Sequence, residues 1–381
     1  METLYIGSTR WRHAFYAAMR SQTTPSAWWR LGLGPLWLLS CLYAGIVRAS
    51  ACSYAYGLRR RQQLPCRVVS IGNLTLGGTG KTPLTMWVAR WYQQQGWRVA
   101  VLSRGYGGHA AGRPRVVSAG AEPLYDWQEV GDEPYLLARE LPGIPVLSGK
   151  NRYRSGCYAC EHFGTQVLIL DDGFQHHAVQ RDLNVVLIDA TNPFGHGALL
   201  PRGTLREPLR ALQRADILVL TRTELAGRAL QPLATQICSW SAPRSLCYMA
   251  TVAEALWQRE DDVPRDVTWL RQRRVVALVG IGNPEAFAAT LTQLGSEVVT
   301  LLVFPDHHAY TEGDWRAIVA TMRRQGAAGL VTTTKDAVRL APHWQAPVPV
   351  YILRTGVTFT QGEEVLQQQL QALMSHADGR Q

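Results

Sequence analysis

The sequence has no internal repeat, no long tail of disordered-type composition and no disulfide framework. Its seven cysteines are an odd number without framework spacing, and Cys157-x-x-Cys160 has no second pair that would complete a zinc site. These absences exclude a solenoid, a disordered chain and a disulfide-stapled secreted domain. They favour a folded chain in a reducing, cytosolic compartment.

The composition is that of a globular protein. Of 381 residues, 46% are hydrophobic and 18% are charged, which predicts two folded domains of about 100–200 residues each. The net charge of +10 indicates a basic face that meets phosphates, nucleic acid or anionic lipid. Thirteen tryptophans, several of them near the N-terminus, favour a membrane surface, so we expect no nucleic-acid partner.

An uncharged apolar run lies between Arg30 and Arg48. A signal peptide fits poorly, because a long segment precedes the run and a nucleotide-type loop follows it. Its 17 residues are at the short limit for a bilayer span, and arginines on both sides give no orientation. We therefore expect a membrane-associating segment at 1–60, with an apolar helix in the cytoplasmic interface; a buried core helix is the alternative.

A strand–helix–strand pattern follows this segment. Residues 67–73 form an apolar run, a glycine-rich loop leads into helical spacing over 81–95, and 97–103 are apolar again. This pattern predicts a parallel sheet within a nucleotide-binding domain at 61–240. Further short apolar runs, typical of buried parallel strands, lie at 166–170, 184–188 and 216–221.

A second α/β pattern begins after a connector at about 240–270. We expect a smaller α/β domain at 241–381. Its strands are predicted at 274–280, 297–304, 329–332 and 348–353, and its helices at 284–294, 311–325 and 363–375.

The glycine-rich loop predicts binding of a nucleoside triphosphate. Its glycines let successive backbone N–H groups point at phosphate oxygens, and the helix that follows adds its positive N-terminal dipole. Lys81 would reach the β- and γ-phosphates, and the Thr82 hydroxyl would ligate Mg²⁺. The usual first glycine is replaced by a threonine. The loop consists of Thr75, Leu76, Gly77, Gly78, Thr79, Gly80, Lys81 and Thr82.

Two adjacent carboxylates, Asp171 and Asp172, follow the apolar run at 166–170. The carboxyl end of a parallel strand is where α/β proteins bind ligands, and a Mg²⁺–nucleotide complex needs a carboxylate there. The alternative is an acidic turn without function. Gln175 and His176 place further polar groups at the same rim.

Other polar residues allow two interpretations each. Asp132 precedes a helix, where spacing alone favours an N-cap. His307 ends a strand of the second domain and is a base, a ligand or a surface residue. Arg104 and Tyr106 lie in a glycine-rich turn that either contacts phosphate or is merely exposed. The basic stretch at 200–208, which contains Arg206 and Glu207, is a phosphate clamp or a solvated loop.

Together these motifs resemble the tetraacyldisaccharide 4′-kinases of lipid A biosynthesis. They occur in the order of that family and span about residues 67–340. Thr75 agrees with the family, whereas Thr334 stands where the family usually has glutamate. The stretches that carry the resemblance are 72–83, 103–107, 130–134, 171–176, 205–208, 280–284, 305–307 and 333–339.

The resemblance implies transfer of the γ-phosphoryl group of ATP, with Mg²⁺, to the 4′-hydroxyl of an acylated glucosamine disaccharide 1-phosphate. The product would be the 1,4′-bisphosphate (lipid IVA), and the enzyme would contact lipids at the cytoplasmic face of the Gram-negative inner membrane, as a peripheral or monotopic protein. Asp132 and His307 would act together as the base, which requires the two domains to meet, and Lys81 would be the third catalytic residue. The implied metal ligands are Thr82, Asp171, Asp172 and Glu207, and the implied substrate contacts are Arg104, Tyr106, Gln175, His176 and Arg206.

Two other functions remain possible from the loop alone. One is a membrane-associated P-loop switch ATPase that phosphorylates no lipid, and the other is a nucleotide-dependent binding module. Leu76 stands where the signature lysine of the switch ATPases would lie, which argues against the first.

Overall fold

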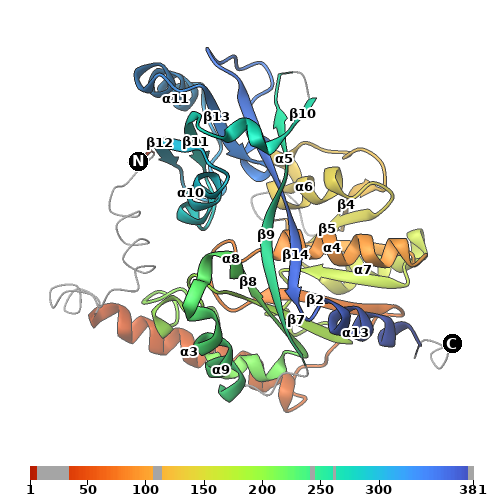
Figure 1. Cartoon of the computed structure of the whole chain (residues 1–381). Helices are drawn as coiled ribbons and strands as arrows, with labels where there is room; N and C mark the ends of the chain where they lie inside the picture. The colour runs from red at the N-terminus through yellow and green to blue at the C-terminus, as the bar shows by residue number, and fades with distance from the viewer. Residues whose placement is uncertain (7–33, 106–113, 241–244, 261–262, 376–381) are drawn as a thin grey trace. The chain divides into compact units, whose positions relative to one another are not determined.

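The structure is a computed structural model that describes residues 1–6, 34–105, 114–240, 245–260 and 263–375 (Figure 1). The chain divides into two compact units. The small unit contains Thr251–Gly356 and residues 1–6, which include the strand β1, Glu2–Tyr5, and the large unit contains the remaining described residues. The chain passes from one unit to the other within β9, Ser245–Gln258, and again within β14, Val350–Gln361.

The large unit is built on a predominantly parallel sheet, as expected. Its strands have the order β9-β8-β7-β2-β6-β3-β5-β4, and only β4 runs antiparallel to its neighbour. Every residue of β2, β3, β6 and β8 is buried, which explains their continuous apolar sequences. The strands are β2 Arg67–Asn73, β3 Val99–Ser103, β4 Arg115–Ala119, β5 Pro145–Ser148, β6 Val167–Asp171, β7 Leu183–Asp189 and β8 Ile217–Thr221.

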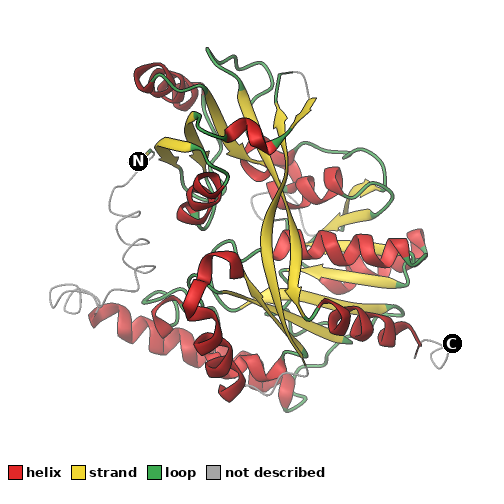
Figure 2. Cartoon of the chain, viewed as in Figure 1, coloured by secondary structure: helices red, strands yellow, loops and turns green. Residues whose placement is uncertain are grey.

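Helices, red in Figure 2, cover this sheet. Successive strand residues point to opposite faces, so that Val69 belongs to the core under α4 while Val68 belongs to the core with α7. The helices are α3 Gly34–Ala55, α4 Lys81–Gln94, α5 Trp127–Val130, α6 Asp132–Glu140, α7 Arg152–Phe163, α8 Thr223–Ala226, α9 Leu230–Trp240 and α13 Glu363–Ser375.

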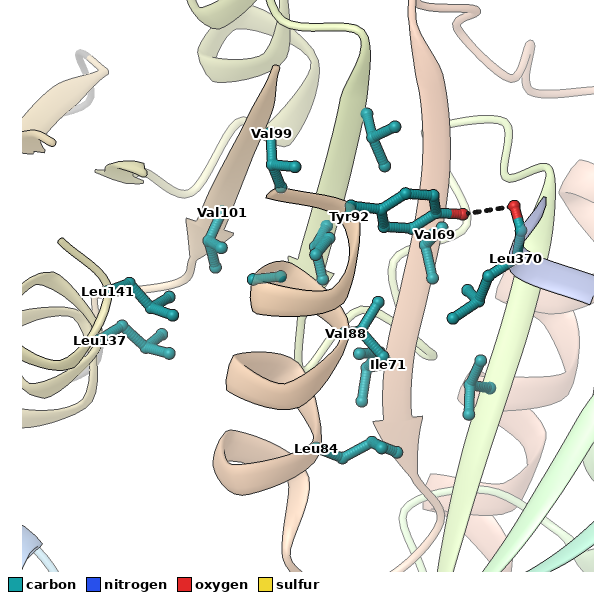
Figure 3. Packing of buried hydrophobic residues seen from close by; sticks show 14 of the residues in the cluster. Val69, Ile71, Leu84, Val88, Tyr92, Val99, Val101, Leu137, Leu141 and Leu370 are labelled. Carbon is teal, nitrogen blue, oxygen red and sulfur yellow. Dashed lines mark hydrogen bonds between the residues drawn. The ribbon is translucent and has the colours of Figure 1, made fainter. Parts of the chain in front are cut away.

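Helix α13 differs from the expectation that 241–381 form one domain. Leu366 and Leu370 are fully buried in the core that α4 and the sheet of the large unit share. The Tyr92 hydroxyl of α4 donates a hydrogen bond of 2.9 Å to the backbone oxygen of Leu370 (Figure 3). The C-terminal helix therefore completes the large unit, which a linear division of the sequence does not anticipate.

The strands of the small unit have the order β1-β12-β11-β13-β14, and each is parallel to its neighbour. Buried residues pack on both faces of these strands. Strand β10, Val263–Arg265, pairs with β9 in antiparallel fashion. The other elements are β11 Arg274–Val279, β12 Glu297–Val303, β13 Gly329–Thr333, α10 Pro284–Gln293, α11 Glu312–Gln325 and α12 Thr334–Ala337.

The expected N-terminal segment at 1–60 contains parts of both units. Glu2–Tyr5 form the edge strand β1, paired in parallel with Thr300–Val303 of β12, so these residues belong to the small unit. The apolar helix is α3, which has 22 residues and is long and apolar enough to cross a membrane. Only 6% of its most apolar window is buried, so α3 is not the core helix of the alternative interpretation.

Candidate active site

The glycine-rich loop connects β2 to α4 in the large unit. Gly77 and Gly80 have φ values of 108° and 84°. Residues other than glycine are strained in this region of the backbone map. Helix α4 begins at Lys81, directly after Gly80. The loop thus has the turn that the sequence predicts, with the N-terminus of a 14-residue helix at its end.

Two residues from the end of β8 hold the loop from outside. The Arg222 guanidinium donates to the backbone oxygen of Gly78 and forms an ion pair with Asp189, which ends β7. The Thr221 hydroxyl donates to the backbone oxygen of Thr79 at 3.0 Å. Because peptide groups are planar, fixing these two oxygens also fixes the N–H groups of the residues that follow. Sequence analysis missed Arg222, whose only local sign is its position after an apolar strand.

Lys81 faces the acidic residue that follows β6. Its ammonium group lies 3.5 Å from Asp172 and donates to the side-chain oxygen of Asn73 at 3.2 Å. Arg206 approaches the same carboxylate to 2.8 Å. Burial alone would raise the pKa of Asp172, but the charges of Lys81 and Arg206 outweigh burial and hold this pKa well below its usual range. Two cations are therefore positioned beside the phosphate loop.

Asp171 occupies a different environment from its neighbour. It is buried at the end of β6 and accepts a hydrogen bond of 3.1 Å from the Thr85 hydroxyl of α4. Burial, followed by the negative charges of Glu133 and Asp172, raises the pKa of Asp171 to about 7. Glu133 was not singled out from the sequence, although it is adjacent to Asp132 in the same motif.

These residues fit a magnesium–nucleotide complex. Among the described residues, no group of three or more His, Cys, Asp or Glu side chains is arranged as a metal site. Mg²⁺ needs no such cage, since it is commonly held by one or two carboxylates together with the phosphates of the nucleotide. The crowding of Asp171, Asp172 and Glu133 provides the negative charge that such a cation would neutralise.

Asp132 is the first residue of α6 rather than its cap. The N-cap is Gly131, with φ of 93°, and the Asp132 carboxylate accepts a hydrogen bond of 2.9 Å from the N–H of Glu133. The residue is 4% exposed, so its carboxylate is held at the positive end of a helix with little access to water.

Glu207 is bound by an arginine of the large unit. Its two carboxylate oxygens accept from the guanidinium of Arg214 at 2.8 and 2.9 Å, and the residue is 2% exposed. A bidentate pair of this kind satisfies both oxygens. A metal role for Glu207 would require the carboxylate to leave Arg214.

Gln175 and His176, two of the predicted substrate contacts, follow Asp172 in the large unit. Gln175 donates to the backbone oxygen of Asn73 at 2.9 Å. Burial, followed by the charges of Arg152, Arg181 and Arg104, lowers the pKa of His176 to about 4, so its imidazole is neutral at neutral pH. Tyr106 lies outside the described residues.

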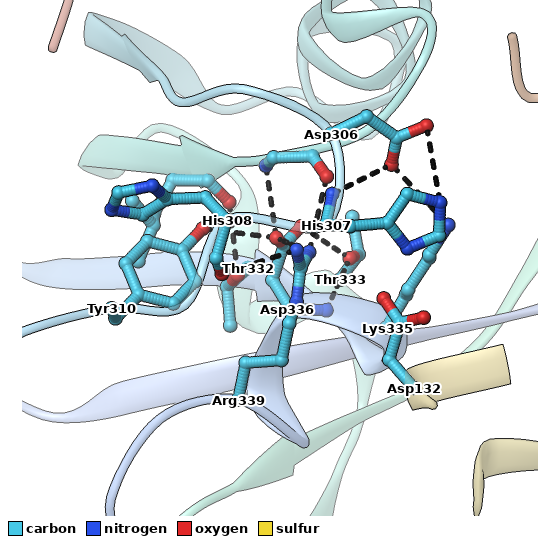
Figure 4. A network of polar contacts seen from close by, with 12 residues as sticks. Asp132, Asp306, His307, His308, Tyr310, Thr332, Thr333, Lys335, Asp336 and Arg339 are labelled. Atoms are coloured by element: carbon cyan, nitrogen blue, oxygen red, sulfur yellow. Dashed lines mark hydrogen bonds and ion pairs between the residues drawn. The ribbon is translucent and has the colours of Figure 1, made fainter. Parts of the chain in front are cut away.

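His307 follows β12 in the small unit and has a left-handed backbone conformation, with φ of 60° (Figure 4). Its N–H donates to Asp306 at 3.1 Å, and its imidazole Nε2 lies 3.8 Å from the same carboxylate. The ammonium group of Lys335 lies 3.3 Å from the Asp306 carboxylate. Burial would raise the pKa of Asp306, but the charges of Lys335 and His307 outweigh it and lower this pKa.

A buried ionic network supports the loop that carries His307. Asp336 and Arg339 pair with fully buried side chains, and Asp336 also accepts from the Tyr310 hydroxyl and the Gly280 N–H, both at 2.9 Å (Figure 4). Arg339 donates to the backbone oxygens of Gly280 and His308 at 3.0 and 3.3 Å. The network thus ties the loops after β11 and β12 together.

A glycine-rich loop between a parallel strand and a helix, with lysine and threonine opening the helix and acidic residues after the adjacent strand, is typical of P-loop nucleotide-binding proteins. The family model described as tetraacyldisaccharide-1-P 4′-kinase matches residues 34–375. The chain belongs to this family.

Relatives in two bacteria and a solved structure agree with this result. The tetraacyldisaccharide 4′-kinase of Syntrophus aciditrophicus is 43% identical over 79% of this chain and 82% of that protein. The enzyme of the same name from Anaeromyxobacter sp. strain Fw109-5 is also 43% identical, over 91% of this chain and 93% of that protein. The crystal structure of LpxK from Aquifex aeolicus in complex with ATP is 32% identical, with a TM-score of 0.68, and covers 90% of this chain and 99% of that one.

The environment of Asp171 predicts a pH-dependent stability. The pKa of Asp171 is about 7 in the folded protein, whereas its ordinary value is 3.8, so folding favours the protonated carboxyl. The free energy of unfolding that this group contributes is therefore present below about pH 4 and is lost as the pH rises through 7. We expect Asp171→Asn to remove this loss in the nucleotide-free protein. Melting temperatures between pH 4 and 7 test this, with the exposed Glu122→Gln as control. Equal pH profiles for wild type and Asp171→Asn would contradict it.

The contact of Arg222 with the phosphate loop predicts a role in ATP affinity. Removing a charged hydrogen bond costs about 1.5–3 kcal/mol, so Arg222→Gln is expected to raise the Kd for ATP about 10- to 100-fold. Binding titrations with a non-hydrolysable ATP analogue measure the effect. Arg228→Gln, an exposed arginine of the same region, is the matched control. An unchanged Kd for Arg222→Gln would show that the contact of Arg222 with the phosphate loop does not contribute to ATP binding.

Proposed function

We propose that this chain transfers the γ-phosphoryl group of ATP to the 4′-hydroxyl of a tetraacylated glucosamine disaccharide 1-phosphate. Membership of the family over residues 34–375 makes it an ATP-dependent kinase of lipid A biosynthesis. The observation that carries the proposal in this chain is the placement of Lys81 and Arg206 against Asp172, beside the phosphate loop. Cations held there can exchange a carboxylate for the phosphates of a nucleotide.

The nucleotide occupies the loop from Thr75 to Thr82 in this proposal. Backbone N–H groups and the α4 dipole bind the phosphates, and Lys81 moves from Asp172 to the β- and γ-phosphates. Thr82, Asp171 and Asp172 are the residues that would hold Mg²⁺. When bound, this ion supplies charge neutralisation for the triphosphate.

Asp132 and His307 are the proposed base for the sugar hydroxyl. An alcohol is a weak nucleophile near neutral pH, and a positioned base accelerates its reaction by about 10²–10⁴-fold. The His307 imidazole would accept the proton, and the Asp132 carboxylate would orient and stabilise the resulting imidazolium. Asp306 contacts both the N–H and the ring of His307, and Lys335 contacts Asp306 in turn, so that this carboxylate supports the orientation of the ring.

The lipid substrate places the reaction at a membrane. Transferring an acyl chain to water costs about 0.8 kcal/mol per CH₂, so the enzyme must approach the bilayer. The exposed apolar surface of α3 and the basic net charge of the chain suit the anionic cytoplasmic face of the Gram-negative inner membrane. Around the phosphate site, Arg104, Tyr106, Gln175, His176 and Arg206 are the proposed contacts with the disaccharide phosphate.

A labelling assay separates this kinase from a switch ATPase. We expect γ-labelled ATP and the acylated disaccharide 1-phosphate in detergent to give labelled lipid with the wild-type chain and none with Lys81→Ala. Label that appears only as free phosphate would support the ATPase and reject the kinase. Circular dichroism of Lys81→Ala checks that the variant is folded.

The proposed base predicts a loss confined to the chemical step. We expect Asp132→Asn and His307→Asn each to lower kcat by about 10²–10⁴-fold while the Kd for ATP stays near that of wild type. His343→Asn, an exposed histidine of the small unit, is the control. Near-normal kcat in either variant would remove that residue from the mechanism.

A further inference from the structure

The inner face of α3 is hydrogen-bonded to the loop formed by residues 199–206. The Ser40 hydroxyl donates to the backbone oxygen of Leu199 at 2.9 Å, and the Tyr43 hydroxyl donates to the backbone oxygen of Arg206 at 3.0 Å. These contacts join the helix to both ends of the loop. The apolar helix is therefore attached by directed polar contacts, which a lipid anchor alone does not need.

The same loop is paired with the phosphate loop. The N–H of Leu76 donates to the oxygen of Thr204, and the N–H of Arg206 donates to the oxygen of Leu74, both at 2.7 Å. Thr75 and Leu205 form an antiparallel bridge between them. Residues 204–206 thus form a short ladder with the first residues of the phosphate loop.

Arg206 joins these two sets of contacts. Its carbonyl accepts from Tyr43, its N–H pairs with Leu74, and its guanidinium contacts both oxygens of Asp172 at 2.8 and 2.9 Å. Asp172 in turn lies 3.5 Å from Lys81. A continuous series of hydrogen bonds and ion pairs therefore runs from α3 to the lysine of the phosphate loop.

The opposite face of α3 is apolar and exposed. Residues three or four positions apart lie on the same side of a helix. One side of α3 can therefore bind the loop at 199–206 while another side contacts a membrane. Ser40 and Tyr43 belong to the inner face. The outer residues are Trp37, Leu38, Leu39, Leu42 and Ile46, which are 52–64% exposed.

We propose that Tyr43 is a positioning residue for phosphoryl transfer, which acts through Arg206 on the phosphate site, and that α3 is part of the catalytic unit as well as its membrane contact. This inference rests on the proposed kinase function. Tyr43 touches neither nucleotide nor metal; its hydroxyl fixes the carbonyl of Arg206 and so the position from which the guanidinium meets Asp172. A helix that only anchors the chain would affect membrane retention and the KM for lipid.

The test is Tyr43→Phe in the full-length chain, which removes one hydroxyl and keeps the ring. Loss of a hydrogen bond of this kind predicts a fall in kcat of about 3- to 10-fold. Retention on vesicles of phosphatidylethanolamine and phosphatidylglycerol should remain that of wild type, because Tyr43 lies on the inner face of α3. Tyr56→Phe, at an 81% exposed tyrosine just after α3, is the matched control.

A variant of the outer face should show the opposite pattern. Leu38→Ser combined with Leu42→Ser is expected to lose vesicle retention and to raise the KM for lipid. If Tyr43→Phe instead behaves like this variant, or has the kcat of wild type, the positioning role is rejected. Absence of lipid labelling by wild type would reject the kinase function itself, which is a separate outcome.

A double-mutant cycle tests whether the effect passes through Arg206. In an Arg206→Ala background there is no guanidinium to position, so Tyr43→Phe should cause little further loss of kcat in single-turnover measurements. Losses that multiply, so that Tyr43→Phe costs the same factor in both backgrounds, would show that Tyr43 acts independently of Arg206 and would overturn the proposed route.

Discussion

The phosphate site depends on the ionic contact that Asp172 makes with Lys81 and Arg206. This carboxylate ties together the end of β6, the start of α4 and the loop at 199–206, three segments far apart in sequence. Removing one partner of a buried ion pair leaves an uncompensated charge, which costs about 3–5 kcal/mol. Asp172 therefore keeps both cations at the phosphate loop before a nucleotide is present, when their mutual repulsion would otherwise separate them.

The order of the strands determines which side chains reach this contact. In the parallel series β8-β7-β2-β6, all carboxyl ends lie at one edge of the sheet. That edge collects Arg222 after β8, Asp189 at the end of β7, Asn73 at the end of β2 and the acidic pair at β6. Arg222 binds the loop, Asn73 and Asp172 bind Lys81, and Asp189 pairs with Arg222. The topology of the sheet, rather than proximity in sequence, assembles the site.

The elements that sequence reasoning predicted well are those with a strong local signature. Continuous apolar runs predicted the parallel strands, and glycines before a lysine and a threonine predicted the phosphate loop. The contacts of Arg222 with Gly78 and of Tyr43 with Arg206 join residues 144 and 163 positions apart, and no local pattern encodes such partners. Sequence reasoning places helix α13 in the wrong unit for the same reason. Its helical spacing is evident in the sequence, but its packing against Tyr92 joins residues far apart in the chain. Glu207 illustrates the converse: a carboxylate in a promising motif whose oxygens are occupied by Arg214.

In the small unit, a carboxylate paired with a cation likewise fixes the position of His307. A non-glycine residue in the left-handed region costs about 1–2 kcal/mol and persists only where its surroundings determine its conformation. His307 meets this condition because its N–H is bound by Asp306, which Lys335 contacts in turn, and because Asp336 and Arg339 fix the loops on which it lies. In both units, then, a carboxylate held by a cation at the carboxyl end of parallel strands fixes a residue of the proposed site. Such fixed charges suit a reaction whose catalysis is mainly positioning and electrostatic stabilisation, because little reorganisation remains to be made when phosphoryl transfer begins.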